Sequence, residues 1–240
     1  MKILIVSPKN KSVFNFRGDL IRDMIRQGHE VVVTGPNRDY IEDIMDLGVA
    51  EFIEVKLVKD NTSIKGDLNY LRSLLSVMRS QKPDLVFGYT IKPVIYGSIA
   101  AKLSGVARIY AMVPGLGRVY ASSGFKARII RLITKILYKI AFSACDKVIF
   151  QNNDDIQELV QEGYLPIDKT VRVNGSGVNM DRFFRTELPE KTVFLMACRI
   201  LREKGIVEFC EAARMLKHSG VEAQCILLGG FDHSMGALSM

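Results

Sequence analysis

The sequence has no tryptophan, and only three histidines and four cysteines among its 240 residues. Three scattered histidines are too few for a metal centre, and no two cysteines form a C-x-x-C pair. The composition therefore predicts no metal site and no disulfide framework. We expect the thiols to be reduced and buried in apolar surroundings; they are Cys145, Cys198, Cys210 and Cys225.

The glycine motifs of nucleotide cofactor sites are missing too. The turn after the first predicted strand, SPKNKSVFNFRG at 7–18, contains no G-x-G-x-x-G. The second strand ends in Thr34-Gly35, where a dinucleotide site would place an acidic residue against a ribose. Neither G-x-x-x-x-G-K-[ST] nor Y-x-x-x-K occurs. These absences disfavour NAD chemistry and P-loop phosphoryl transfer, and we expect no cofactor.

Acidic residues are absent from one long stretch. The 61 residues between Asp84 and Asp146 contain no Asp or Glu but nine Lys or Arg, within a net charge of +7. This asymmetry predicts a positive face and an anionic partner. No uncharged run exceeds nine residues, so we expect no bilayer-spanning segment. Met1-Lys2 leads at once into a strand-like run, which predicts no secretory signal.

Apolar, β-branched runs alternate with segments of helical period. Strands are predicted near 2–7, 30–35, 51–57, 84–90, 107–113, 146–152 and 171–176. Helices are predicted near 16–27, 37–47, 67–81, 93–104, 124–143 and 153–162. Strict alternation indicates right-handed βαβ units, a parallel sheet and helices on both of its faces. The predicted fold is a doubly wound, Rossmann-like α/β domain.

A second unit begins late in the chain. The pattern lapses over 179–191, NMDRFFRTELPEK, and resumes with a strand at 192–198, a helix at 206–218 and a strand at 224–229. Two parallel strands and one helix cannot cover both faces of a sheet. We therefore expect one complete domain over 1–180, a linker over 181–191 and an incomplete Rossmann-like domain over 192–240.

The turn ACRILREKG at 197–205 places cations between a strand and a helix. Such turns lie at the carboxyl edge of the sheet, where open α/β folds bind ligands. Arg199 and Lys204, together with the amides of the helix N-terminus, can bind phosphate. They can equally be solvated turn residues.

Two longer stretches carry a family resemblance. NGSGVNMDRF at 174–183 and ACRILREKGIVEFCEAARML at 197–216 resemble the interdomain region and the start of the C-terminal domain of retaining, family-4 glycosyltransferases of the GT-B fold. The resemblance implies that Arg199 and Lys204 hold the diphosphate of a nucleotide-sugar and stabilise the leaving group without a metal. The family's E-x7-E element would lie beyond residue 240, so we expect a truncated chain that is inactive alone.

A second resemblance narrows the acceptor. FNFRGDLI at 14–21, FGYTIKPVIYGSIAAKLSGV at 87–106 and VPGLGRVY at 113–120 are similar to bacterial transferases that build capsule, O-antigen or lipid-linked oligosaccharides. It implies transfer of a sugar, such as an N-acetylhexosamine from a UDP donor, to a polyprenyl-diphosphate-linked saccharide. The residues expected to line the substrate cleft are Thr90, Lys92, Tyr96, Gly115, Gly117 and Arg118. The plainer interpretation of 90–93 is a helix start with Pro93 in its first turn.

The predicted helix over 124–143 carries a cationic stripe. On a helical wheel, Arg128, Arg131, Lys135 and Lys139 fall within an arc of about 80°. The opposite side is expected to pack and carries Ile129, Ile133, Ile136, Leu137 and Ile140. The stripe is either a solvated rim or a surface that docks on anionic lipid.

A lipid-linked acceptor favours membrane docking, and with it a peripheral location at the cytoplasmic face of the membrane. Nucleic acid is not an expected partner, because aromatic residues do not alternate with basic ones on any predicted strand. Two alternatives stay open: a transferase with a soluble acceptor, and a non-catalytic module that binds a membrane or a nucleotide.

Overall fold

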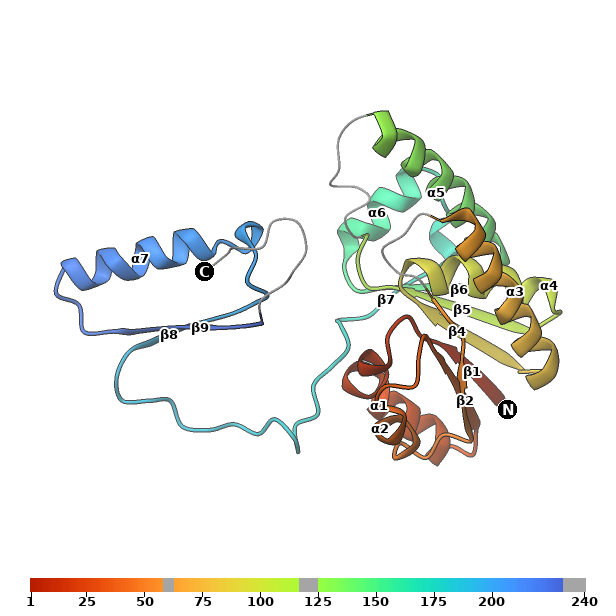
Figure 1. Ribbon diagram of the computed structural model, residues 1–240, viewed down its shortest axis with the longest axis horizontal. Coiled ribbons are helices and arrows are strands. Elements are labelled where there is room, and N and C mark those ends of the chain that lie inside the picture. The colour runs from red at the N-terminus through yellow and green to blue at the C-terminus, as the bar shows by residue number, and fades with distance from the viewer. Residues whose placement is uncertain (58–62, 117–124, 231–240) are drawn as a thin grey trace. The chain divides into compact units, whose positions relative to one another are not determined.

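The computed structural model describes residues 1–57, 63–116 and 125–230 (Figure 1). The chain divides into two compact units, Met1–Asn179 and Met180–Met240.

Unit 1 is built on one parallel sheet of seven strands in the order β3-β2-β1-β4-β5-β6-β7. Its strands are β1 (Lys2–Val6), β2 (Glu30–Gly35), β3 (Glu51–Glu54), β4 (Leu85–Tyr89), β5 (Arg108–Val113), β6 (Lys147–Phe150) and β7 (Thr170–Arg172). The chain winds outward from β1 to β3 and then returns to place β4 on the other side of β1, in register Ile3↔Leu85. The order therefore reverses between β1 and β4, and such a reversal opens a crevice at the carboxyl ends of the two strands.

The connections are helical, as the alternating pattern predicts. They are α1 (Asn10–Arg26), α2 (Ile41–Met45), α3 (Ile64–Gln81), a π-helical turn (Pro93–Gly97) continuing into α4 (Ser98–Leu103), α5 (Phe125–Ala144), α6 (Asn153–Gln161) and a 3-10 turn (Ile167–Lys169). The doubly wound parallel fold predicted from the sequence is confirmed.

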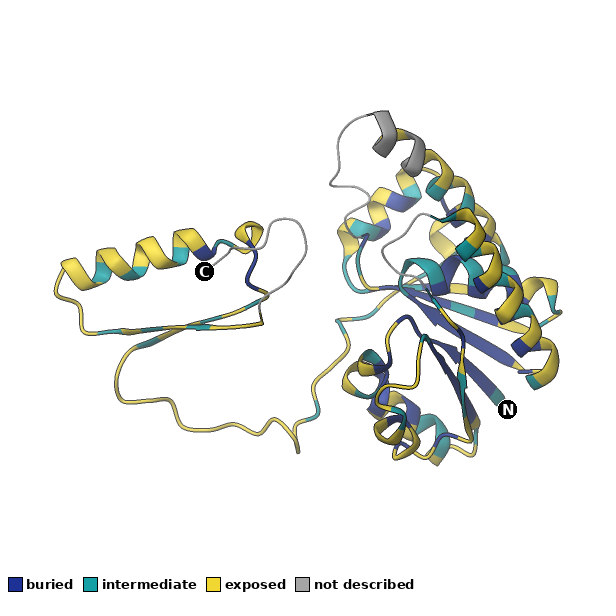
Figure 2. Ribbon diagram, in the orientation of Figure 1, coloured by how far each residue is buried: buried dark blue, intermediate teal, exposed yellow. Residues whose placement is uncertain are grey.

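Two apolar layers cover the sheet, because successive strand residues point to opposite faces. In β1, Ile3 and Ile5 join the cluster under α1 and α2, whereas Leu4 and Val6 join the cluster under α3, α4 and α5. All four side chains are at most 2% exposed. The buried centre of unit 1 appears as dark strands in Figure 2.

Several element bounds differ from the predicted ones. Helix α1 begins at Asn10 rather than at residue 16, because its first turns already pack Asn10 and Val13 into the core. Strand β7 ends at Arg172 rather than at residue 176, because Gly175 and Gly177 adopt positive φ angles of 93° and 76° that a strand does not contain.

Unit 2 is a single βαβ arrangement. It contains β8 (Val193–Ala197), a 3-10 turn (Arg202–Lys204), α7 (Ile206–His218) and β9 (Gln224–Leu228), with β8 and β9 parallel. Among its described residues, Leu195 and Leu228 are 59% and 61% exposed, so large parts of the strands stay uncovered (Figure 2). One helix cannot bury both faces of a two-stranded sheet.

The prediction for the cysteines holds only in part. All four thiols are free, and Cys145 is buried, which raises its pKa to about 11. Cys210, in contrast, is exposed on α7, and Cys198 and Cys225 are half-buried. The apolar surroundings expected from the sequence are missing because the described part of unit 2 contains only one α-helix, α7.

Gly88 allows β4 and the following helical turn to approach closely. A Cβ atom at this position would lie 2.9 Å from the carbonyl oxygen of Pro93, a backbone atom that cannot rotate away. We expect Gly88→Ala to lower the free energy of unfolding by about 1–3 kcal/mol in urea titrations. The control is Gly115→Ala, where a Cβ atom would meet no atom of a described residue within 4 Å. Equal stability of the two variants would contradict the close approach.

Candidate functional site

The loop after β4 carries three of the residues expected to line the cleft. Thr90 follows the last strand residue and adopts a φ of +68°, a strained conformation for a residue other than glycine. The chain then forms the π-helical turn Pro93–Gly97. Strained backbone and π-helical turns both concentrate at functional sites, so the local geometry sets this loop apart.

Lys92 and Tyr96 meet at one carboxylate. The Lys92 ammonium donates to Asp67 Oδ1 over 2.8 Å, and the Tyr96 hydroxyl donates to Asp67 Oδ2 over 2.9 Å. Both charged side chains are about four-fifths buried. Sequence reasoning missed Asp67, which lies in the first turn of α3 and gives no sign of partners 25 and 29 residues away.

This network fixes the chemistry available to Tyr96. Burial and the hydrogen bond to the Asp67 carboxylate both raise the pKa of the Tyr96 phenol above its ordinary value. The phenol is therefore a neutral hydrogen-bond donor at physiological pH and not a general base. Much of the positive charge of Lys92 is balanced inside the protein, which weakens its expected role as a phosphate ligand.

Arg17, from the FNFRGDLI stretch, is 5% exposed and lies where the sheet reverses its order. Its Nη1 donates to Ser176 Oγ (2.9 Å) and its Nη2 to the sulfur of Met112 (2.9 Å). Its guanidinium carbon is 5.2 Å from the ring centroid of Tyr89. Arg17 thereby joins helix α1 to the ends of β4 and β5 and to the loop after β7.

The charge of Arg17 is compensated weakly. No carboxylate pairs with it among the described residues, and its buried Nε has no hydrogen-bond partner. Desolvation lowers the pKa of the guanidinium, and the neighbouring Tyr89 opposes this shift. Tyr89 is itself held by hydrogen bonds to Ser7, which follows β1 (2.7 Å), and to Ser12 in α1 (2.9 Å).

The loop after β5 is described only in part. Gly115 is half-buried, and a Cβ atom added there would meet no atom of a described residue within 4 Å. Gly117 and Arg118 lie outside the described residues. The sequence prediction for those two positions is therefore untested.

In unit 2, Arg199 and Lys204 lie on one loop between β8 and α7. Both are exposed. Gly205 follows with a φ of 79° and opens α7 without a side-chain cap, so the first amides of the helix face the loop that carries both cations.

A glycine that sequence reasoning missed lies beside this turn. A Cβ atom at Gly229 would lie 1.8 Å from the carbonyl oxygen of Cys198, and Ile200 N donates to Gly230 O over 3.1 Å. The Gly229-Gly230 pair therefore lets the chain after β9 pass against the residues that flank Arg199. The pair at the end of an apolar run was the signal available in the sequence.

Helix α5 corrects the prediction of which side packs. Among its side chains that the structure describes, the buried ones are Tyr138, Ala141 and Phe142. Leu132, Ile133, Ile136 and Ile140 are 60%, 52%, 52% and 48% exposed, although the sequence placed three of them on the packed side. At 100° per residue these four span an arc of about 100° beside Arg128 and Lys139, both exposed. We call these four residues the α5 apolar stripe.

The cationic stripe is less uniform than the sequence suggested. Lys135 donates to Glu162 over 2.7 Å and lies 5.1 Å from the ring centroid of Tyr164, so it is turned toward α6. The side chain of Arg131 lies outside the described residues.

Within the part of the chain that the structure describes, no helix is both long and apolar enough to cross a membrane. Over the same residues, no group of His, Cys, Asp or Glu is arranged to hold a metal ion.

The profile of the "Glycosyl transferase 4-like" family matches residues 2–152, well over half of the chain. The chain belongs to this family. This glycosyl transferase 4-like chain is 28% identical, over its whole length, to a Campylobacter jejuni N,N'-diacetylbacillosaminyl-diphospho-undecaprenol alpha-1,3-N-acetylgalactosaminyltransferase, of which it covers 66%. It is 29% identical over 76% of its length to an Escherichia coli UDP-Gal:alpha-D-GlcNAc-diphosphoundecaprenol alpha-1,3-galactosyltransferase, of which it covers 48%.

A solved structure shares the fold of this glycosyl transferase 4-like chain. A glycosyltransferase from Rickettsia africae superposes with a TM-score of 0.64 at 19% identity, over 95% of this chain and 60% of that one. The chain thus spans less than two thirds of the length of each of these three proteins. The predicted membership of a family-4-like glycosyltransferase group is confirmed.

The Asp67 network can be tested by stability. We expect Asp67→Asn to lower the free energy of unfolding by about 1–3 kcal/mol, because the mostly buried Lys92 ammonium loses its anionic partner. In a double-mutant cycle, the loss should shrink when Lys92 is already methionine. Glu54→Gln, at an exposed acid ending β3, is the control. Additive effects of Asp67→Asn and Lys92→Met would contradict the coupling.

Proposed function

We propose that this chain forms the acceptor-binding domain and the start of the donor-binding domain of a retaining glycosyltransferase. The enzyme transfers a hexose, of the UDP-N-acetylhexosamine type, to a polyprenyl-diphosphate-linked saccharide during bacterial surface polysaccharide synthesis. The observation that carries the proposal is that two family relatives, one of them matched over the whole chain, are both named for transfer to diphosphoundecaprenol-linked sugars.

Arg199 and Lys204 are the proposed donor-side catalytic residues. When the bond between the sugar and the diphosphate breaks, negative charge develops on the leaving oxygens. Two cations beside an uncapped helix N-terminus stabilise that charge, and each such donor contributes about 2–4 kcal/mol to the transition state. In this proposal the two cations stabilise the leaving group without a metal ion. Thr90, Lys92, Tyr96 and Gly115 are proposed on the acceptor side, together with Gly117 and Arg118.

The turn between β8 and α7 offers a matched control for the donor-side assignment. In the full natural polypeptide that contains these residues, we expect Arg199→Ala and Lys204→Ala each to lower kcat by roughly 10²–10³. Arg202→Ala removes an exposed cation from the same turn and should leave kcat within about twofold. The assay measures sugar transfer from a UDP-sugar to a prenyl-diphosphate-linked saccharide. Equal losses of kcat in all three variants would show that Arg199 and Lys204 contribute only general surface charge and would contradict the assignment.

The location proposed is the cytoplasmic face of the membrane, with α5 as the docking element. The α5 apolar stripe is exposed, and Arg128 and Lys139 flank it on a segment that contains no acidic residue. Apolar side chains bury in the outer acyl region while flanking cations reach the anionic headgroups, and each cation contributes about 1 kcal/mol. This arrangement supports a shallow insertion rather than docking by charge alone.

Co-sedimentation with vesicles separates insertion from charge attraction. We expect Ile133→Ser/Ile136→Ser/Ile140→Ser to weaken binding to anionic vesicles by at least roughly tenfold, because buried apolar area is lost. The control is Leu103→Ser, which removes a 64% exposed leucine from α4. If the stripe inserts, the wild type should stay partly bound to anionic vesicles in high salt, whereas a protein held by charge alone should be released. Unchanged binding of the triple variant would contradict insertion of the stripe.

A further inference from the structure

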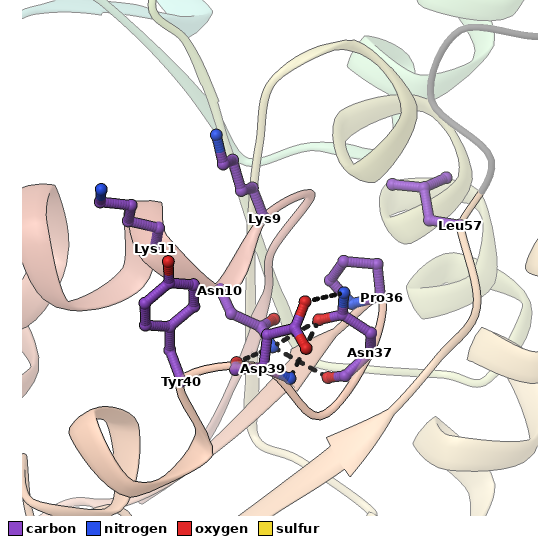
Figure 3. A pocket seen from close by; sticks show the side chains of 8 residues that line it. All are labelled: Lys9, Asn10, Lys11, Pro36, Asn37, Asp39, Tyr40 and Leu57. Atoms are coloured by element: carbon purple, nitrogen blue, oxygen red, sulfur yellow. Dashed lines mark hydrogen bonds between the residues drawn. The ribbon is translucent and has the colours of Figure 1, made fainter. Parts of the chain in front are cut away.

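A cavity of about 340 Å³ opens at the carboxyl ends of β1 and β2 (Figure 3). Two lysines, polar side chains of the loop after β2 and one aromatic ring share its wall. Its lining comprises Lys9, Asn10, Lys11, Pro36, Asn37, Asp39, Tyr40 and Leu57. None of these residues belongs to the sites predicted from the sequence, although the cavity lies at the ligand-binding edge of the sheet.

The positive end of helix α1 forms one side of the cavity. Lys9 is the N-cap residue and makes no side-chain cap, and the first turn contains no acidic residue. Lys9 and Lys11 are both exposed, and neither forms an ion pair with a described residue. Cations at the positive end of a helix destabilise it unless an anion is bound there. This end of α1 is therefore suited to a phosphate group.

Asn10 provides the second, independent observation. It is 2% exposed, and its Nδ2 donates to Asn37 O (2.8 Å) and Asp39 O (2.6 Å). Its Oδ1 is buried without a partner, at a place where a Cβ atom on Gly35 would lie 1.9 Å away. A buried acceptor without a donor costs free energy, so the wall of the cavity contains an Asn10 amide whose hydrogen bonding is incomplete.

The opposite wall is suited to a sugar rather than to a bare anion. Tyr40 is held at a φ of 58° and is 49% exposed, so part of its ring is available to an apolar sugar face. Asp39 accepts a hydrogen bond from Asn37 Nδ2 over 2.7 Å and keeps its other carboxylate oxygen available for a hydroxyl. A carboxylate here repels free phosphate, whereas a phosphorylated sugar can satisfy both the lysines and the acceptors.

We propose that this cavity binds the sugar phosphate portion of a diphosphate-linked acceptor, with Lys9 and Lys11 on phosphate and Asn10, Asp39 and Tyr40 on the sugar. This inference rests on the proposed function, in which a prenyl-diphosphate-linked acceptor supplies a sugar and a phosphate on one molecule. The UDP-sugar donor carries the same two groups, and a comparison of KM values separates the two. The cavity would be a second acceptor subsite, separate from the loop that carries Lys92, whose charge Asp67 largely balances.

Calorimetry with N-acetylglucosamine 1-phosphate tests the cavity directly. The wild-type chain should bind this probe at least about tenfold more tightly than inorganic phosphate or free N-acetylglucosamine. Lys9→Gln/Lys11→Gln should lower the affinity for the probe by at least about tenfold. The matched control, Lys65→Gln/Lys102→Gln, removes two exposed lysines elsewhere in unit 1 and should leave binding unchanged. Equal weakening in both double variants, or no binding by the folded wild type, would overturn the inference.

The sugar side of the cavity has its own variant. Asp39→Asn removes the repelling charge and a hydroxyl acceptor together, so the preference for the sugar phosphate over inorganic phosphate should fall by several-fold. Retention of the full preference would remove Asp39 from the site.

Kinetics of the full natural polypeptide separate this inference from the proposed function. Lys9→Gln/Lys11→Gln should raise KM for the prenyl-diphosphate acceptor at least about tenfold and leave KM for the UDP-sugar unchanged. Transfer with an unchanged acceptor KM would overturn the cavity assignment while the proposed function stands. Absence of transfer by the wild type, together with the expected calorimetry, would overturn the proposed function and leave a sugar phosphate site.

Discussion

The parallel pairing of β1 with β4 is the constraint on which the rest of unit 1 depends. Because β2 and β3 lie on one side of β1 and β4 to β7 on the other, the connections leave the carboxyl edge in opposite directions. Ser7 at the end of β1 and Tyr89 at the end of β4 join across this point by a 2.7 Å hydrogen bond. The loops that carry Lys9 and Thr90 begin at this junction, and the loop that carries Ser176 is joined to it through Arg17.

Arg17 shows how polar contacts hold the junction together. A buried guanidinium without a carboxylate is costly, and here an aromatic ring, a hydroxyl, a thioether and a backbone carbonyl take its place. The ring, the hydroxyl and the thioether belong to three other segments of the chain, whereas the carbonyl is that of the neighbouring Phe16. Asp19, two residues further along α1, accepts hydrogen bonds from Asn179. Helix α1 therefore fixes the path of the chain up to the last residue of unit 1.

The periodicity of the sequence was sufficient to predict the fold, because each strand of a doubly wound sheet is apolar on both faces and each helix has a distinct spacing. It was insufficient for α5, where apolar residues occur nearly all round the helix. Only the actual packing of Tyr138 and Phe142 decides that Ile133 and Ile136 face outward. The partners of Lys92 and Arg17 were likewise hidden, since contacts between residues 25 and 159 positions apart leave no local pattern.

Electrostatics at the carboxyl edge distinguishes two kinds of cation. Lys92 and Arg17 are largely buried and have internal partners, so they shape the loops and offer little free charge to a ligand. Lys9 and Lys11 are exposed at an uncapped helix end, and Arg199 and Lys204 are exposed beside another one. The proposed function requires cations of the second kind, because an exposed side chain can reach a bound phosphate whereas a buried one cannot. The two uncapped helix ends are therefore the places where we propose that each unit binds phosphate, at some cost in stability.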